Sequence, residues 1–409
     1  MCSNIHFRLL ILCLLAPQLV WAKGWVRVRI AEEVPSAVIR GFDLRVYDLR
    51  RWGLNLLANA DKSSEWEVQC TGSRVHVVAR YSKQNQKPLD FEGPVSFQTP
   101  VGFLSYGSYP YRDEIRVYPR GKVCDVVNEV SLEKYLDGLV NSEFSSKWSE
   151  ESVAAQVVVA RTYAYHQIRD AHARGAHYDL DATTKDQVYN GSLREDYHSS
   201  RAVEKTRGLV LTLGASSYPI KAFYHSTCGG QTELPQHVWG RPYPGLRRSV
   251  RCSYCRESPR FHWVLSLTRA EISAAIQNGA KTGSIPKGWP SNWREVLVEG
   301  KLLDLRFSHK DPENRVSNVT TVWAHGRGIV DLKVGAPLFR EWIGPTKLRS
   351  TSFDAVPNSH NSSWHFSGLG NGHGVGMCQW GAKVMGEKGY KMQEILKAYY
   401  PDATLRKLW

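Results

Sequence analysis

Residues 131–165 read SLEKYLDGLVNSEFSSKWSEESVAAQVVVARTYAY, and their spacing predicts two helices that meet near a carboxylate, Glu143. Apolar residues recur at helical spacing in the first helix, and this pattern stops as Glu143 is reached. Ser149 is a suitable N-cap for the second helix, and two glutamates follow it, where acidic groups suit the helix dipole. Residues 153–160 are apolar on nearly every side, which predicts a buried central helix.

The position of Glu143 has two interpretations. A carboxylate on a helix break beside a buried helix is well placed to have a raised pKa and to act as an acid or base. An exposed glutamate in an ordinary helix–loop–helix is the alternative, since many perturbed carboxylates are structural. The spacing alone does not choose between them.

The first 22 residues have the pattern of a secretory signal. Arg8 is followed by an apolar run at 9–15 and by a small-residue cleavage site that ends at Ala22. The run is too short to span a bilayer, and no later segment is a better candidate. The sequence therefore predicts an exported protein, periplasmic or associated with the cell wall, without a transmembrane helix in the mature chain. A retained, uncleaved anchor is the alternative.

The net charge of +14 becomes +13 when Arg8 leaves with the signal. Such a basic chain favours a polyanionic partner, and for an exported protein this points to cell-wall polymer or a membrane surface and not to nucleic acid. The 14 Trp and 19 Tyr residues fit a carbohydrate cleft, in which flat rings stack on sugars, and they also fit an ordinary core rich in aromatic residues.

Six cysteines remain after the signal is removed, and an even number in an exported chain permits disulfides. Cys70 and Cys124 both lie in the strand-rich N-terminal part, so they are candidates for one disulfide.

The other cysteines suggest a structural metal site. His225-x2-Cys228 and Cys252-x2-Cys255 have the paired-ligand spacing of structural zinc. Two disulfides formed among Cys228, Cys252, Cys255 and Cys378 are the alternative.

The pattern of strands and helices predicts an α+β fold. It comprises a strand-rich N-terminal part, the central buried helix, mixed sheets that form a substrate cleft, and an inserted α/β region with a helix at 269–277. The expected divisions are a signal at 1–22, a strand-rich region at 23–125, a core at 126–260, an insertion at 261–365 that shapes or covers the cleft, and a closing core segment at 366–409.

Residues 370–376, GNGHGVG, form a glycine-rich loop. The loop lacks the Lys-Ser/Thr of a P-loop, so a nucleotide site is not expected. Its four glycines would let the backbone approach another surface closely. His373 and Gln379 are candidates for polar contacts to a sugar, and a turn held by a satisfied histidine is the alternative.

Three stretches together resemble the SpoIID/LytB family, named for stage II sporulation protein D. They are LEKYLDGLVNSEF…SVAAQVVVARTYAY at 132–165, ATTKDQVYNG at 182–191 with AFYHSTCGGQTE at 222–233, and NGHGVGMCQWGAKVMGEKGY at 371–390. The resemblance implies a lytic transglycosylase that cuts peptidoglycan glycan strands, preferably strands denuded of stem peptides. Other members of the family enhance an N-acetylmuramoyl-L-alanine amidase.

The resemblance also implies roles for individual residues. The family's catalytic acid falls on Glu143, and Arg161 would orient a substrate carboxylate or hydroxyl. The polar residues that would line the groove are Gln187, Tyr189, His225, Ser226, Thr227, His373 and Gln379.

The family's zinc loop is not carried over. Some members bind zinc through His and Cys just before the Gln-Val-Tyr segment. The equivalent loop in this chain offers four polar candidates and no cysteine: His177, Asp179, Asp181 and Asp186. The candidate metal ligands therefore remain Cys228, Cys252 and Cys255, for structural zinc or else disulfides, and catalysis needs no cofactor.

The expected reaction needs only one carboxylate. An ordinary glycosidase uses two, whereas a lytic transglycosylase protonates the glycosidic oxygen and then removes the proton from the C6 hydroxyl of the same MurNAc. The product has a 1,6-anhydro ring, and proximity supplies much of the rate. We expect this reaction on glycan strands. The alternatives are a non-catalytic partner of an amidase and a hydrolase in which water replaces the C6 hydroxyl.

Overall fold

The computed structural model describes residues 24–50, 55–80, 87–216, 218–283, 285–310, 314–360 and 362–409. The expected signal at 1–22 lies outside these ranges. The fold is α+β, with 28% helix and 38% strand, so the predicted fold class is confirmed. No helix among the described residues is both long enough and apolar enough to cross a bilayer.

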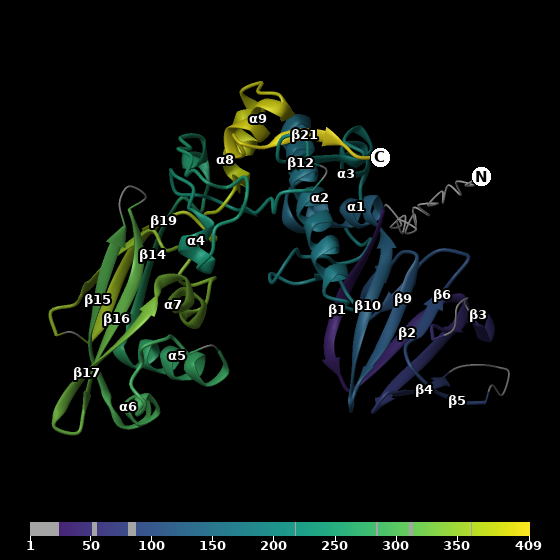
Figure 1. Ribbon diagram of the computed structural model, residues 1–409, viewed down its shortest axis with the longest axis horizontal. Coiled ribbons are helices and arrows are strands. Elements are labelled where there is room, and N and C mark those ends of the chain that lie inside the picture. The colour runs from purple at the N-terminus through teal and green to yellow at the C-terminus, as the bar shows by residue number, and fades with distance from the viewer. Residues whose placement is uncertain are drawn as a thin grey trace, which may run out of the picture.

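A large sheet forms one side of the molecule (Figure 1). Buried residues alternate with more exposed ones along its strands. In the first strand Val26 and Val28 are buried and Arg27 between them is half-buried, so one face of the sheet packs on the core. The pairing is antiparallel except for the short strand β11 (Leu180–Asp181), which runs parallel to β1. The strands are β1 (Trp25–Val34), β2 (Ser36–Asp48), β3 (Asn55–Thr71), β4 (Arg74–Ala79), β5 (Leu89–Glu92), β6 (Val95–Gln98), β7 (Leu104–Tyr106), β8 (Tyr109–Tyr111), β9 (Glu114–Arg120) and β10 (Val123–Ser131).

The predicted disulfide is present in this sheet. Cys70 on β3 and Cys124 on β10 are bonded to each other. The bond joins two strands that are not neighbours in the sheet order.

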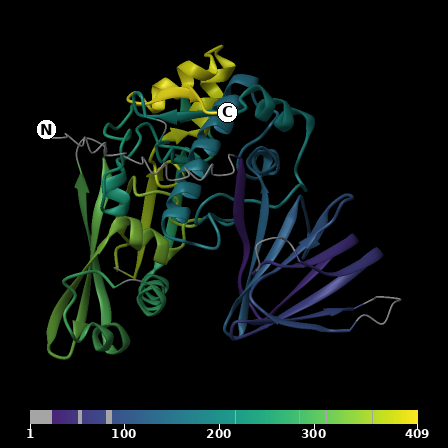
Figure 2. The ribbon, with the colours of Figure 1, turned by 45° about the vertical axis from the view of Figure 1, so that its right-hand side comes forward.

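Helix α1 (Leu132–Glu143) follows β10 directly and ends at Glu143, as the spacing predicts. Helix α2 (Glu150–Ala173) begins after Ser149, whose hydroxyl accepts the backbone N–H of Ser152 at 3.3 Å. Every residue from 152 to 164 is buried, so α2 is the expected central helix. Figures 1 and 2 both show it between the two β-rich parts of the molecule.

The rest of the core is assembled from segments far apart in the sequence. Two short strands, β13 (Tyr224–His225) and β20 (Met377–Cys378), pair in parallel, and β12 (Leu209–Thr212) pairs with β21 (Thr404–Lys407). The C-terminal segment therefore returns to pack on α2. The helices of this part are α3 (Tyr197–Lys205), α4 (Pro235–Trp239), the 3-10 helix η1 (Tyr254–Glu257), α8 (Gln379–Glu387) and α9 (Met392–Tyr399).

Residues 262–369 form a second unit with its own hydrophobic core, which includes Trp323, Phe339 and Trp364. The first and last strands of this unit, β14 and β19, pair in antiparallel register, so the chain enters and leaves at one place. Its elements are β14 (His262–Thr268), α5 (Arg269–Thr282), α6 (Trp293–Glu299), β15 (Lys301–Lys310), β16 (Arg315–His325), β17 (Gly328–Gly335), α7 (Ala336–Ile343), β18 (Phe353–Pro357) and β19 (Ser363–Leu369).

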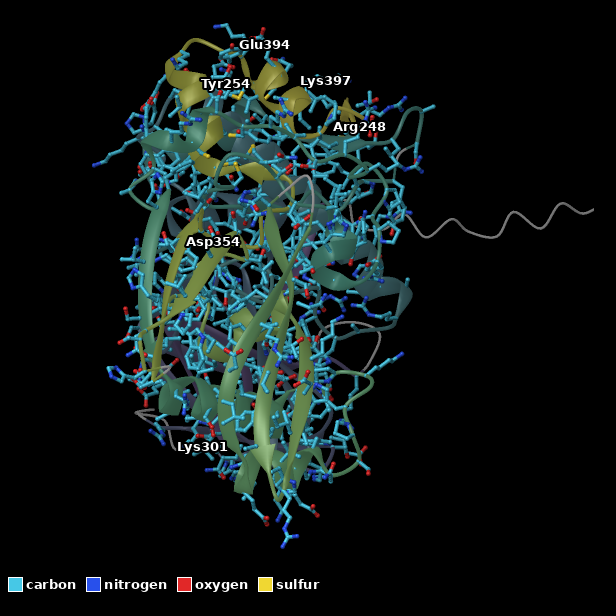
Figure 3. All side chains as sticks on the ribbon, turned by 90° about the vertical axis from the view of Figure 1, so that its left-hand side faces the viewer. Arg248, Tyr254, Lys301, Asp354, Glu394 and Lys397 are labelled. Atoms are coloured by element: carbon cyan, nitrogen blue, oxygen red, sulfur yellow. A yellow bond between two sulfur atoms is a disulfide. The ribbon has the colours of Figure 1, made fainter. Side chains whose placement is uncertain are left out.

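Strand β19 extends this unit to Leu369, beyond the expected boundary at 365. Figure 3 views the unit from the side, with Lys301 and Asp354 on its strands and Tyr254 and Glu394 at the opposite end of the molecule. The proposed domain divisions stay a prediction, and so does the role of the insertion at the cleft.

Candidate functional site

Glu143 lies half-buried at the C-terminal end of α1. Its Oε1 accepts the backbone N–H of Val188 at 2.5 Å, and among the described residues no other group donates to this carboxyl. The loop that carries Val188 packs closely on α1, since a Cβ on Gly138 would come within 2.1 Å of the Gly191 carbonyl oxygen. The glycine therefore helps to bring the Val188 amide to the carboxylate.

Burial raises the pKa of Glu143, and the hydrogen bond from Val188 offsets part of that rise because it favours the ionised form. A raised pKa alone does not identify a site. Burial and the charge of Glu195 also raise the pKa of Asp137, on the same helix, to about 6. The surroundings of the two carboxyl groups distinguish them, because Asp137 lies beside the ion pair of Arg112 with Glu195.

Two tyrosine hydroxyls lie near Glu143 and are linked through Gln187. Tyr135 donates to Gln187 Oε1 at 3.0 Å, and Gln187 Nε2 donates to the Tyr224 hydroxyl at 3.1 Å. Burial raises the pKa of both tyrosines, and the charge of Glu143 raises it further. Gln187 itself is fully buried, so it orients the tyrosines and does not face a ligand.

Gln379 contacts the backbone at the same point, since its Nε2 donates to the carbonyl of Glu143 at 3.2 Å. Next to this contact lie two half-buried aromatic side chains, Trp148 and Trp380, with ring centroids 5.2 Å apart. The Lys383 ammonium is 5.1 Å from the Trp380 ring. These side chains give one flank of the carboxylate an aromatic, cationic edge.

A second aromatic group lies on segments that follow β12. Phe223 stacks on Trp239 with centroids 4.2 Å apart, and the His373 ring is 5.1 Å from Trp239. Lys221 lies 5.4 Å from the Phe223 ring. Trp239 is 40% exposed, so this group reaches the surface. Tyr163 connects it to the carboxylate, because its ring is 5.9 Å from Phe223 and the charge of Glu143 contributes to its raised pKa.

His225 and His373, which the sequence suggested as substrate contacts, are neutral in these surroundings. Burial lowers the pKa of His225 to about 4 and also lowers that of His373. His225 Nδ1 donates to the Val375 carbonyl at 3.0 Å, and the Val375 N–H donates to His373 Nδ1 at 3.0 Å. The buried Nε2 of His225 has no hydrogen-bond partner among the described residues. The rings lie 5.5 Å apart and can only accept or donate as uncharged groups.

Arg161 is not placed to orient a substrate, contrary to the expected role. Its side chain is fully buried and forms an ion pair with Glu133 at 2.7 Å. Its other nitrogen donates to the Thr206 hydroxyl at 3.2 Å. The guanidinium therefore ties α1, α2 and α3 together.

Two further predicted contacts are also buried in the core. Tyr189 is 3% exposed and donates to Asn128 at 3.0 Å. Thr227 is 1% exposed and shares a hydrogen bond with Ser258 at 2.9 Å. In this structure neither side chain faces a groove. Ser226 is half-buried, and its carbonyl accepts the Trp380 N–H at 3.1 Å.

A second carboxylate, Asp186, lies close enough to influence the same tyrosines, Tyr135 and Tyr163. One of its oxygens accepts from the Tyr163 hydroxyl and from Gln167, each at 2.7 Å, and the other accepts the Asp181 N–H at 2.9 Å. Both of its oxygens are therefore engaged by donors from within the fold.

The remaining acidic and histidine side chains of this loop are paired elsewhere. His177 bonds Asp125 at 2.9 Å, and Asp179 pairs with Arg27 at 2.6 Å. Asp181 pairs with Arg29 at 2.7 Å. These side chains are therefore engaged in ion pairs and hydrogen bonds within the fold.

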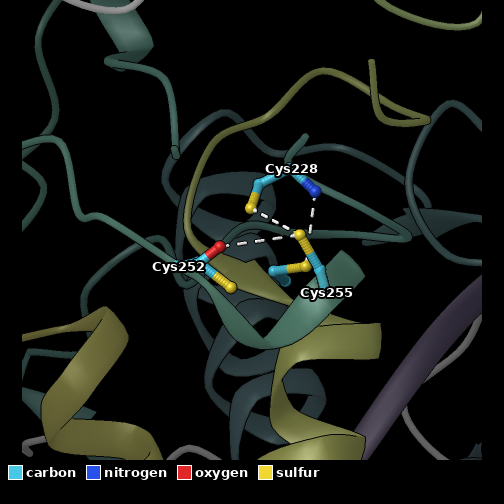
Figure 4. A group of neighbouring side chains, drawn as sticks. Cys228, Cys252 and Cys255 are labelled. Atoms are coloured by element: carbon cyan, nitrogen blue, oxygen red, sulfur yellow. Dashed lines mark hydrogen bonds between the residues drawn. The ribbon is translucent and has the colours of Figure 1, made fainter. Parts of the chain in front are cut away.

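Four cysteines gather behind the site. Cys228, Cys252, Cys255 and Cys378 are buried and free, and their sulfur atoms lie within 4.8 Å of one another. Figure 4 shows the first three side chains pointing toward one another. Cys378 is the fourth member, whereas His225, which the sequence spacing paired with Cys228, does not belong to the cluster.

Sequence reasoning did not identify Tyr135, Tyr224, Trp148 and Trp380 as part of the site. Tyr135 is eight residues before Glu143 on the same helix, a spacing that returns close to the same face. That spacing was an available signal. The approach of Trp380 to Trp148 had no local signal, because the two residues are far apart in the sequence.

Comparisons with known proteins relate this chain to stage II sporulation proteins. A family model described as stage II sporulation protein matches residues 120–213. An uncharacterized protein of Brachyspira hyodysenteriae is 30% identical over 321 residues, which cover 78% of this chain and 77% of that protein. The amidase enhancer of Bacillus subtilis is 30% identical over 298 residues, which cover 66% of this chain and 40% of that protein.

Stage II sporulation protein D of Bacillus subtilis is 27% identical over 292 residues, which cover 68% of this chain and 75% of that protein. The chain thus spans most of this relative and of the Brachyspira protein, and less than half the length of the amidase enhancer.

Proposed function

Because the chain belongs to the stage II sporulation protein D family, we propose that it acts on the cell wall as a peptidoglycan lytic transglycosylase. The exported protein would cleave the MurNAc–GlcNAc bond of denuded glycan strands and leave 1,6-anhydroMurNAc ends. One observation carries the proposal: Glu143 is a half-buried carboxyl group whose pKa burial raises, and its charge acts on two nearby tyrosines, Tyr135 and Tyr224.

Two opposing influences act on the pKa of Glu143, which suits a group that must first donate a proton and then accept one. Burial favours the protonated acid, which can donate to the glycosidic oxygen as the bond breaks. The Val188 N–H favours the carboxylate, which can then accept the proton of the C6 hydroxyl as that oxygen attacks C1. The proton returns to Glu143, the anhydro ring closes, and no water is consumed.

The surroundings support a sugar as the ligand. Two aromatic groups, one with Trp148 and Trp380 and one with Trp239, offer flat apolar faces in the same part of the molecule. Lys383 and Lys221 lie against these aromatic groups, where they suit the lactyl carboxylates of a denuded strand. The net charge of +14 favours association with the same polyanion.

The second candidate function is a non-catalytic enhancer of an amidase. The similarity to the amidase enhancer of Bacillus subtilis supports it. In this case the region around Glu143 would hold glycan strands without cleaving them, and an amidase would be the partner.

A hydrolase is the third candidate, and Asp186 is the carboxylate that would have to activate water. Its two oxygens already accept three hydrogen bonds within the fold, which leaves little room for a water molecule to bind to them. This observation favours the anhydro reaction over hydrolysis.

Mass spectrometry of digested glycan strands tests the three functions. We expect anhydro ends from the wild-type protein and none from Glu143→Gln, which keeps the side-chain shape and an acceptor for Val188. Asp137→Asn is the matched control, because Asp137 is on the same helix and also has a raised pKa but lies beside Arg112 and Glu195. It should leave the products unchanged.

Three outcomes would contradict the proposal. Anhydro ends that persist in Glu143→Gln would exclude Glu143 as the acid. Reducing MurNAc ends that depend on Asp186 would support the hydrolase. Intact strands, with faster release of stem peptides only when an amidase is added, would support the enhancer.

A further inference from the structure

We propose that Cys228, Cys252, Cys255 and Cys378 bind one Zn²⁺ ion through four thiolates, and that this ion joins the segments that carry the site. The four thiols come from three separate parts of the chain: the segment after β13, the η1 segment, and the start of α8. The proposal does not depend on the proposed function, since the ligands are distinct from Glu143 and the groups around it.

The sulfur positions fit a tetrahedral ion. A Zn–S bond of about 2.3 Å places tetrahedral sulfur atoms about 3.8 Å apart. All four sulfurs lie within 4.8 Å of one another, and those of Cys228 and Cys255 are 3.4 Å apart. These separations exceed the covalent S–S distance of about 2.05 Å. The arrangement therefore matches the edges of a metal tetrahedron and not a pair of disulfides.

Several hydrogen bonds to the sulfurs are of the kind that stabilises thiolates. Cys378 Sγ accepts backbone N–H groups from Gly381 at 3.4 Å and from Cys228 at 3.3 Å. The Tyr399 hydroxyl lies 3.2 Å from Cys252 Sγ and can donate to it. Such donors orient metal ligands and stabilise their negative charge. A buried cluster of neutral thiols would gain little from them.

Glycines make room for the sulfurs. A Cβ on Gly381 would come within 2.7 Å of Cys252 Sγ. Gly229 and Gly230 follow Cys228 with φ values of +80° and +113°, which only glycine adopts readily. The backbone can therefore turn tightly behind the Cys228 sulfur.

The donor set selects the metal and its role. Four soft thiolates in a tetrahedron favour zinc or an iron–sulfur cluster over magnesium, calcium or manganese. All four ligands are buried, and four thiolates leave no open position for water or substrate. The ion would therefore be structural.

The consequence for the site follows from the neighbours of the ligands in sequence. Cys378 immediately precedes Gln379, whose amide contacts the backbone of Glu143. Cys228 follows the β13 strand that carries Tyr224. An ion shared by these two cysteines fixes both segments relative to α1.

The test is metal and thiol analysis of the exported chain, purified without chelator. We expect one zinc per chain by elemental mass spectrometry. Four thiols should react after denaturation with a chelator, and the Cys70–Cys124 disulfide should contribute none. Protein purified without zinc would overturn the proposal, whether its four thiols are free or form two disulfides. Iron in place of zinc would also overturn it.

Substitutions test the ligands. Cys378→Ser and Cys252→Ser should each lower zinc content to well below one ion per chain, while His225→Asn should retain it, because His225 is outside the cluster. Retained zinc in both cysteine variants would overturn the assignment. If these variants do not fold, cobalt substitution of the wild-type protein gives a second readout, with thiolate-to-cobalt charge-transfer bands expected. Absence of these bands in cobalt-loaded protein would also overturn it. None of these measurements depends on glycan cleavage.

Discussion

The side-chain amide of Gln379 donates to the backbone carbonyl of Glu143 at 3.2 Å, although the two residues are 236 positions apart in the sequence. The contact joins the end of α1 to the start of α8. The carbonyl at the end of a helix has no partner within the helix, so an external donor stabilises it. The position of the proposed acid therefore depends on a segment that follows the insertion.

Replacing Glu143 with Gln should stabilise the fold more strongly as the pH rises. Burial raises the pKa of Glu143 in the folded chain, whereas the unfolded chain loses this proton at about pH 4.3. Between about pH 4.3 and the folded-state pKa, the folded chain therefore holds a proton that the unfolded chain does not. The wild-type free energy of unfolding therefore falls as the pH rises across that range. Glu143→Gln does not show this decrease, because glutamine does not titrate. Denaturant titrations should show a larger difference in the free energy of unfolding between the two proteins at about pH 7 than at about pH 4. A difference independent of pH would contradict a raised pKa.

Asp137→Asn should remove a separate loss of stability at mildly acidic pH. The pKa of Asp137 is about 6 in the folded chain, against about 3.9 when unfolded, so wild-type stability falls as the pH rises from about 4 to about 6. The variant should gain about 1–2 kcal/mol above pH 6. Thermal melts across this range measure it. If the wild-type curve is flat between these pH values, Asp137 is not perturbed.

Arg161→Met should destabilise the protein by about 3–5 kcal/mol, because it leaves Glu133 partly buried without its cation. The double variant Arg161→Met/Glu133→Gln should recover part of this loss, since the unpaired charge is gone. Denaturant unfolding measures both. An Arg161→Met protein of normal stability but raised KM would instead make Arg161 a substrate contact, as the sequence suggested.

Trp148→Ala and Trp380→Ala should each weaken binding of denuded glycan strands by about tenfold, the loss expected for one stacking ring. Titration calorimetry in the Glu143→Gln background measures binding without cleavage. Tyr197→Ala is the control, because this tyrosine is 72% exposed on α3 and should not affect affinity. Equal affinities for all three variants would place the glycan elsewhere.

Local patterns predicted the elements on which the site is built. The end of α1 at Glu143, the Ser149 cap and the buried α2 all follow from interactions within a few residues. The Cys70–Cys124 pairing was also foreseen, because both cysteines lie in the strand-rich part. The glycine-rich loop approaches another segment as expected, since a Cβ on Gly376 would lie 1.9 Å from the Phe223 carbonyl oxygen.

The partners of several candidate residues depend on long-range contacts, which the sequence pattern does not reveal. The family resemblance implied that Arg161 contacts substrate, but Glu133 in the first turn of α1 pairs with it. Cys378 joined the thiol cluster because β13 and β20 pair across 150 residues, and no local spacing encodes that pairing. Residue type and short spacing identify candidates, whereas their partners are set by topology.

The entry and exit of the second unit lie at a single point, since the Gly370 N–H donates to the Phe261 carbonyl at 2.7 Å and β14 pairs with β19 immediately beyond. A chain that leaves and re-enters at one place lets the backbone path of the scaffold continue on either side of the unit. Beyond that place, Arg315 of the unit donates to the Cys228 carbonyl at 2.6 Å. Residues 262–369 can therefore change in size as a cassette while the framework around Glu143 keeps its backbone path, provided that the contact of Arg315 is kept.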